Sequence, residues 1–196
     1  MDRDGVIIEN RADYVKSLDE VHFIPGVFAA LAGAARLPCR LVIVTNQSAV
    51  GRGLIGLEMA HRINEFVVQR LVAAGGRVDG VYLCPHGPEA DCDCRKPAPG
   101  MLLQAAAELG LDLAASLMIG DALSDVQAGQ RAGARAILVR TGRGQGQLAH
   151  LAPADRASVP VAADLAQALE LAAGLIFTKT PPDGGAEAEQ ISKILP

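Results

Sequence analysis

The sequence predicts an α/β fold, a doubly wound and mainly parallel sheet with helices on both faces. Short apolar, largely β-branched runs alternate along the chain with longer amphipathic or alanine-rich segments, as strand–helix alternation requires. The apolar runs are continuous, which is typical of parallel strands buried on both faces. Of the 196 residues, 50% are hydrophobic but only 3% aromatic. We therefore expect one domain with an aliphatic core.

The first half of the chain predicts two strands and two helices. A helix is expected over residues 27–36, followed by a strand over 41–45 with the sequence LVIVT. A longer helix is expected over 57–74, because apolar residues recur there at helical spacing. The run GVYL at 80–83 predicts the next strand.

The second half continues the alternation. Helices are expected over 99–110 and 124–133, each ending at a glycine. Strands are expected over 117–120, with the sequence LMIG, over 136–139, with the sequence AILV, and over 159–162. A last helix is expected over 164–173. Residues 142–147 are expected to form a loop. One domain should span residues 1–175, and residues 176–196, where the strand–helix pattern ends in the run TKTPPDGGAEAEQ, should form a flexible tail.

A cluster of metal-binding residue types lies between the second expected strand and the helix that follows it. Cys84, His86, Cys92 and Cys94 fall within eleven positions. Zinc takes four N/S donors in closed structural sites, and two close pairs joined by a short loop supply them. We expect an intracellular protein, in which clustered Cys and His residues are more often a metal site than a disulfide framework. The sequence therefore predicts a structural Zn²⁺ in a loop over 84–94.

Composition excludes other classes of partner. The formal net charge is −4, which argues against a nucleic-acid-binding surface. No apolar run approaches the roughly 20 residues that a membrane span needs. We therefore expect a cytoplasmic protein, a monomer, that contacts neither nucleic acid nor membrane. Arg95 and Lys96 follow the zinc loop directly and suggest an anionic small-molecule substrate.

Polar residues follow several of the expected strands. Asp2 and Asp4 open the chain, Thr45 ends the run LVIVT, Lys96 follows the zinc loop, and Asp121 ends LMIG with Asp125 one helical turn later. Each alone could be turn or capping chemistry. Together they suit phosphoryl transfer. Carboxylates from two strand ends can hold one Mg²⁺, one carboxylate can attack phosphorus, and a second can protonate the leaving oxygen. A hydroxyl and an ammonium can neutralise the phosphoryl oxygens.

The ordered motifs DRDG at 2–5, TNQS at 45–48, CRKP at 94–97 and GDALSD at 120–125 resemble the haloacid dehalogenase superfamily of aspartate-nucleophile phosphatases. The zinc loop and the run TNQSAVGRG are similar to one family within it, the D-glycero-D-manno-heptose 1,7-bisphosphate 7-phosphatases. The resemblance covers residues 2–142. It implies a Mg²⁺-dependent hydrolysis of the 7-phosphate of a small phosphorylated sugar through a phosphoaspartate, in the supply of activated heptose for surface polysaccharide.

The resemblance also implies roles for individual residues. Asp2 would be the nucleophile and Asp4 the general acid and base, while Mg²⁺ would be held by Asp2, the backbone carbonyl of Asp4, and Asp121. Thr45 and Lys96 would orient the phosphoryl group. The family has no large cap domain, so the zinc loop would partly close the site. The positions similar to substrate-contacting residues are Asn10, Arg11, Asp13, Tyr14, Asn46, Gln47, Ser48, Arg52 and Arg95.

Three departures from the family pattern stand out. Val6 replaces a frequent Thr, and Ala122 stands where the family resembles Gly-Asp-Lys, which removes one cation beside the substrate. Asp2 should end a buried central strand, yet only Met1 precedes it. We expect that strand to be missing from the sequence as given, with a misplaced start site as the favoured explanation over a shortened protein.

Two other functions compete with this interpretation. Histidinol-phosphate phosphatases, or phosphatases of another small phosphomonoester, share the DRDG motif and a similar zinc loop. A non-catalytic module stabilised by zinc is the alternative from a different class, since the first strand is absent.

Overall fold

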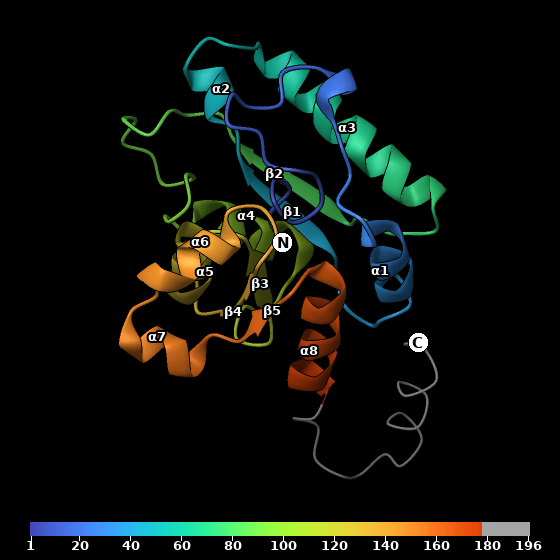
Figure 1. The fold of residues 1–196 in the computed structure, drawn as a ribbon, viewed down its shortest axis with the longest axis vertical. Coiled ribbons are helices and arrows are strands. Elements are labelled where there is room, and N and C mark those ends of the chain that lie inside the picture. Colours follow the sequence, from blue (N-terminus) through green and yellow to red (C-terminus); the bar gives the residue numbers. More distant parts are fainter. Residues whose placement is uncertain (178–196) are drawn as a thin grey trace.

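The computed structural model describes residues 1–177, whose strands form two parallel sheets set side by side (Figure 1). In one, β1 (Val42–Asn46) pairs with β2 (Gly80–Cys84). In the other, β3 (Leu117–Gly120) pairs with β4 (Arg135–Val139), and β4 with the short β5 (Val161–Ala162). The expected strands are confirmed, with boundaries shifted by a residue or two.

The main chain of Met1 and Asp2 joins the two sheets. The Met1 amine donates to Val42 O at 2.8 Å, Val44 N donates to Met1 O at 2.9 Å, and Asp2 N donates to Ile119 O at 2.8 Å. Within residues 1–177 no strand occupies the rest of the space between β1 and β3. An apolar cavity of about 350 Å³ lies there, lined by side chains of both strands and of the last helix.

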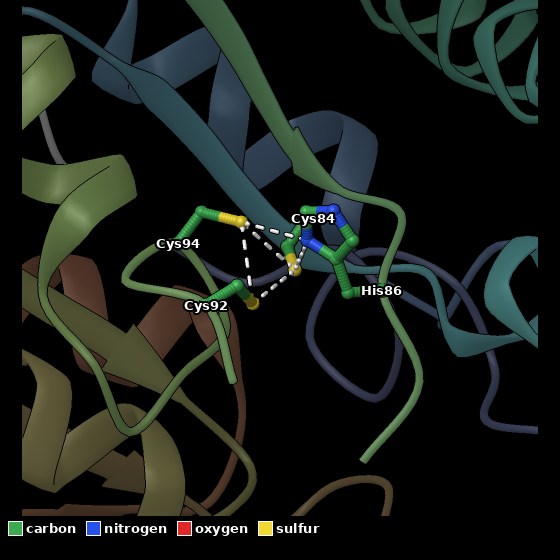
Figure 2. Close-up of side chains that lie close together, drawn as sticks. All are labelled: Cys84, His86, Cys92 and Cys94. Carbon is green, nitrogen blue, oxygen red and sulfur yellow. Dashed lines mark hydrogen bonds between the residues drawn. The ribbon is translucent and has the colours of Figure 1, made fainter. Parts of the chain in front are cut away.

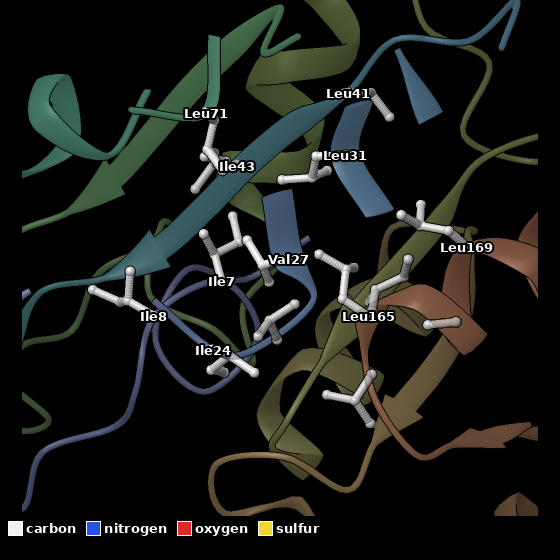
Figure 3. Packing of buried hydrophobic residues seen from close by; sticks show 14 of the residues in the cluster. Ile7, Ile8, Ile24, Val27, Leu31, Leu41, Ile43, Leu71, Leu165 and Leu169 are labelled. Atoms are coloured by element: carbon white, nitrogen blue, oxygen red, sulfur yellow. The ribbon is translucent and has the colours of Figure 1, made fainter. Parts of the chain in front are cut away.

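Helices cover both faces of the sheets. On one face lie α1 (Val27–Ala34), α3 (Leu57–Ala73) and α8 (Leu165–Phe177), and on the other lie α4 (Gly100–Leu109) and α5 (Leu123–Arg131). Alternate strand residues belong to opposite faces. Ile43 packs in the cluster with α1, α3 and α8 (Figure 3), whereas Val44 packs against α4. This alternation accounts for the continuous apolar runs in the sequence, because both faces of such a strand are covered by helices.

The remaining elements are short. They are α2 (Ser48–Gly51), α6 (Gly144–Gln147), α7 (Pro153–Ser158) and the 3₁₀ turns Leu18–Glu20 and Leu148–His150. The expectation of a loop over 142–147 is thus wrong for its second part, which forms α6. The last helix also continues beyond the expected end at 173, through Phe177. The rest of the expected tail, 178–196, lies outside the described residues. Of the helices in 1–177, none is long and apolar enough to cross a membrane.

Candidate functional site

The carboxyl ends of the strands open into a cavity of about 790 Å³. Asp2 and Asp4 lie beside the end of β1, and Asp121 follows β3. Lys96 lies just after the zinc loop in the chain and lines the same cavity. In a doubly wound sheet this edge is where ligands bind, because all parallel strands end there. A groove of about 730 Å³ also runs along β2 between α3 and α4, but it contains none of the strand-end residues.

Three buried carboxylates and one ammonium meet at the floor of the cavity, where Asp2 and Lys96 line it and Asp121 and Asp125 lie just beneath. Oxygen atoms of Asp2, Asp121 and Asp125 all lie within 4.8 Å of one another. Lys96 Nζ lies 2.9 Å from Asp2 Oδ1 and 2.7 Å from Asp125 Oδ1, and it donates to Val44 O at 2.9 Å. Burial raises the pKa of Asp2 to about 7, although the positive charge of Lys96 opposes this increase.

This charge balance fits a divalent cation. Three carboxylates face the Lys96 ammonium and the partly exposed Arg143 guanidinium, so one negative charge is left that a hard cation with oxygen ligands would neutralise. Asp125 is already engaged on both oxygens, since its Oδ2 accepts the Ala122 N–H at 3.0 Å at the start of α5 and its Oδ1 faces Lys96. Asp2 and Asp121 are therefore the side chains best placed to hold Mg²⁺.

Asp4 is held apart from this floor by three side chains. Gln47 Nε2 donates to its Oδ2 at 2.8 Å, Thr45 Oγ1 donates to the same oxygen at 3.3 Å, and an Arg3 guanidinium nitrogen lies 3.0 Å away. Arg3 is only 1% exposed and donates in turn to Asn64 Oδ1 at 2.6 Å. The Asp4 carboxylate is thus fixed in orientation, 20% exposed at the cavity wall.

Two glycines allow the backbone to approach Asp121 closely. Gly5 has φ +82°, and a Cβ there would lie 2.2 Å from Asp121 Oδ2. Gly142, with φ +57°, would place a Cβ 2.4 Å from the same oxygen. No side chain fits at either position, and the left-handed backbone favours glycine independently. The turns after Asp4 and after β4 therefore close around Asp121.

Asp121 accepts several hydrogen bonds in this enclosure. Asn10 Nδ2 donates to Oδ2 at 3.0 Å, and the backbone N–H of Arg143 donates to Oδ2 at 2.8 Å. The Arg143 guanidinium reaches both oxygens, with Nε at 3.3 Å from Oδ2 and Nη2 at 3.2 Å from Oδ1.

The cysteine and histidine side chains converge at the end of β2 (Figure 2). Cys84 Sγ lies 3.2 Å from Cys94 Sγ and 3.9 Å from Cys92 Sγ, and His86 Nδ1 lies 3.3 Å from Cys94 Sγ. A tetrahedral zinc with Zn–S bonds of about 2.3 Å would separate its ligand atoms by roughly 3.8 Å. The four donors therefore have the spacing and the chemistry of a Cys₃His zinc site.

The thiols of this cluster need a cation to ionise together. Burial, followed by hydrogen bonds with Cys84 and Cys92, raises the pKa of Cys94 to about 12. Cys84, Cys92 and Cys94 are all free thiols. Because zinc binds thiolates, the bound ion would replace the protons that hold these sulfurs together. Arg95 connects the cluster to the cavity, donating to His86 O at 3.1 Å and to Ser48 Oγ at 2.8 Å.

Most of the residues singled out in the sequence meet at this cavity. Thr45 and Asp121 are buried just beneath it. Those of them that line it are Asp2, Asp4, Asn10, Arg11, Tyr14, Asn46, Gln47, Ser48, Arg95 and Lys96. Asp13 and Arg52 are not among its lining residues. Asp13 pairs with Lys16 at 2.6 Å, and Arg52 lies 3.8 Å from the exposed Glu89.

Sequence reasoning missed Arg3, Asn64 and Arg143. Arg143 could have been found, because it follows the fourth expected strand at the same sheet edge as the other strand-end residues. Nothing in the spacing of Arg3 and Asn64 indicates that they contact each other, since 61 positions separate them.

The fold and the site define an aspartate-based phosphatase of the haloacid dehalogenase type. A family model described as HAD-hydrolase-like matches residues 93–168. The chain is 43% identical over 152 residues to a D-glycero-beta-D-manno-heptose-1,7-bisphosphate 7-phosphatase of Photorhabdus laumondii, covering 73% of this chain and 80% of that protein. It is 40% identical to the enzyme of the same name from Bordetella bronchiseptica, covering 76% and 83%. The chain therefore belongs to the haloacid dehalogenase-like family of D-glycero-beta-D-manno-heptose-1,7-bisphosphate 7-phosphatases.

Solved structures show the same relationship. The crystal structure of D,D-heptose 1,7-bisphosphate phosphatase from B. bronchiseptica, complexed with magnesium and phosphate, matches with a TM-score of 0.80 and 38% identity, covering 87% of this chain and 94% of that one. A putative HAD-like phosphatase from Mesorhizobium loti matches with a TM-score of 0.74 and 32% identity, covering 92% and 86%.

Proposed function

We propose that this chain is a Mg²⁺-dependent phosphatase that removes the 7-phosphate of D-glycero-beta-D-manno-heptose 1,7-bisphosphate through a phosphoaspartate at Asp2. One observation carries the proposal. Asp2 lies at the cavity floor between the Lys96 ammonium and the Asp121 carboxylate, with an oxygen free for a metal and for phosphorus. A close relative that crystallises with magnesium and phosphate supports the same chemistry.

The residues divide the reaction between them. An Asp2 oxygen attacks phosphorus, so a P–O bond to Asp2 forms while the bond between phosphorus and the sugar oxygen breaks. Asp4 gives its proton to that leaving oxygen. It then accepts a proton from the water that attacks the phosphoaspartate, which releases inorganic phosphate and restores the Asp2 carboxylate and the protonated Asp4.

The remaining groups position and neutralise the phosphoryl group. Mg²⁺, held by Asp2, Asp121 and the backbone carbonyl of Asp4, would neutralise charge on the phosphoryl oxygens. Lys96 supplies fixed positive charge from a buried position, and Asp125 holds the Lys96 side chain in place at 2.7 Å. Gln47, Thr45 and Arg3 fix the orientation of Asp4.

Residues farther from Asp2 in the cavity would contact the substrate. Asn10, Arg11, Tyr14, Asn46, Ser48 and Arg95 would contact the sugar, because they line the cavity above Asp2. Zinc would keep the loop over 84–94, and with it Arg95, in place. We place this reaction in the cytoplasm, where the enzyme would act as a monomer on a small phosphorylated sugar.

A panel of substrates tests the function. Phosphate release is measured with the heptose 1,7-bisphosphate, histidinol phosphate and simple hexose phosphates, each with Mg²⁺ and with a chelator. We expect the highest kcat/KM for the heptose bisphosphate and no turnover without Mg²⁺. A higher kcat/KM for histidinol phosphate would establish the alternative phosphatase. Zinc-loaded protein with no phosphatase activity on any compound would favour the non-catalytic module.

A further inference from the structure

Arg143 lies on a turn whose backbone is held by contacts on both sides and whose side chain is largely exposed. The turn follows β4, and Thr141 Oγ1 fastens it by donating to Gly5 O at 2.6 Å. Gly142 packs directly against Asp121 and the Gly5 backbone. The Arg143 side chain nevertheless remains 56% exposed and lines the cavity. It can therefore change position without disturbing the turn.

The other cations of the cavity are engaged elsewhere. Lys96 is held by Asp2 and Asp125, and Arg95 donates to Ser48 and to the His86 carbonyl. Arg11 lies 3.4 Å from Asp13 and 3.8 Å from Glu20, at the cavity rim. None of these contacts involves Asp121, so none of these three cations competes with a metal ion for that carboxylate.

Arg143 differs because its acidic partner belongs to the metal site. In the described part of the chain, its ion pair is with Asp121, and its Nη2 and Nε approach the two oxygens of that carboxylate at 3.2 and 3.3 Å. A divalent cation and this guanidinium would compete for the same oxygens. The backbone N–H of Arg143 donates to Oδ2 at 2.8 Å and can keep that bond while the side chain leaves.

We propose that Arg143 exchanges partners during binding: its guanidinium neutralises Asp121 until Mg²⁺ takes that carboxylate, and it then binds the second phosphate of the bisphosphate substrate. This rests on the proposed function and names the residue that distinguishes a bisphosphate from a monophosphate. A guanidinium suits this task, because its planar donors form two parallel hydrogen bonds to a phosphate. Lys96 and Mg²⁺ are meanwhile occupied by the phosphate that is transferred.

If Arg143 and Mg²⁺ compete for Asp121, removal of the Arg143 charge should strengthen the binding of Mg²⁺. Mg²⁺ is titrated calorimetrically into wild type and into Arg143→Ala, with no substrate present. The variant should bind Mg²⁺ about two- to fivefold more tightly, the range set by the loss of one exposed ion pair that competes with the metal. Arg140→Ala serves as the matched control, because Arg140 lies near the same turn, is exposed and does not line the cavity. Weaker Mg²⁺ binding by Arg143→Ala would show that Arg143 only supports Asp121 and would overturn the exchange.

The second measurement concerns the substrate. Steady-state constants are compared for the heptose 1,7-bisphosphate and for the heptose 7-phosphate, which lacks only the second phosphate. Arg143→Ala should raise KM about tenfold or more for the bisphosphate, as loss of a charge-assisted hydrogen bond does, and leave KM for the 7-phosphate nearly unchanged. Arg143→Lys should restore part of the difference.

Two outcomes separate this inference from the proposed function. An equal increase in KM for both sugars would refute the specificity role while leaving the phosphatase intact. If wild type releases phosphate from neither sugar, the proposed function is wrong and the specificity role falls with it. The Mg²⁺ titration decides the competition at Asp121 in either case.

Discussion

The buried carboxylate of Asp2 should make Mg²⁺ binding depend on pH. Burial raises its pKa to about 7, and the cation binds the ionised form, so below that pKa a proton must leave before Mg²⁺ can bind. We expect the affinity for Mg²⁺ to increase between about pH 6 and pH 8, with protons released on binding at the lower end. Calorimetry in two buffers of different ionisation enthalpy measures both quantities. An affinity that is flat across this interval would contradict the assignment of Asp2 as a ligand.

The variants Asp2→Asn and Asp4→Asn should differ in how much of the turnover they lose. Asp2→Asn removes the nucleophile with little change in volume, so turnover should cease while the fold, followed by circular dichroism, is retained. Asp4→Asn should slow turnover by about 10²–10⁴, the usual contribution of general acid–base catalysis. Activity that persists in Asp2→Asn, with deamidation excluded by mass spectrometry, would rule out the mechanism.

At the residue scale, the strand-end rule located Asp2, Asp4, Thr45, Lys96 and Asp121, because parallel strands all deliver their ends to one edge of the sheet. It could not show which carboxylate each cation faces. That pairing depends on side-chain contacts between distant elements, such as the ion pair of Arg143 with Asp121. Arg52, which the motif pattern favoured, lies instead beside Glu89.

At the scale of elements, the zinc loop should be separable from the chemistry. We expect about one zinc per chain by elemental analysis, since the described residues contain one cluster of three cysteines and a histidine, enough for one tetrahedral site. Cys92→Ser or Cys94→Ser should lose the metal and increase hydrogen exchange over 84–94, because binding energy of the metal holds the loop. Cys39→Ser is the control, since Cys39 is a free thiol outside the cluster. A disulfide among Cys84, Cys92 and Cys94 in anaerobically purified protein would defeat this prediction.

The long elements could be predicted from sequence and the short ones could not. Helices such as α3 (Leu57–Ala73) carry several turns of apolar periodicity, and the buried strands carry continuous apolar runs. Short helices such as α2 and α6 span four residues each. Four residues give a single turn with no period to detect, and tertiary contacts stabilise such turns. For that reason the sequence predicted a loop over 142–147, where the structure has α6.

At the scale of the whole molecule, the space between β1 and β3 should accept an added strand. Met1 already bonds to both strands through its main chain and that of Asp2. Burial lowers the pKa of the Met1 amine to about 5, so a charged group is unfavourable there. Five apolar, β-branched residues placed before Met1 would convert the amine into a peptide bond and fill the cavity of about 350 Å³.

This extension should raise the melting temperature, because each new backbone hydrogen bond contributes about 0.5–1.5 kcal/mol. A Gly-Ser extension of equal length, which cannot fill an apolar cavity, is the matched control. Thermal unfolding of both proteins decides the matter. Equal melting temperatures would show that the space between the two sheets does not admit a strand.

The central claim is that the phosphoryl group passes through Asp2. It is tested most directly by mixing the Asp4→Asn variant with the heptose bisphosphate and Mg²⁺, quenching in acid and mapping the peptides by mass spectrometry. The variant lacks the base that promotes breakdown of the intermediate, so a phosphoryl group sensitive to hydroxylamine should accumulate on the peptide that contains Asp2. Phosphate release without any covalent phosphate at Asp2, or with the phosphoryl group on another residue, would contradict the account.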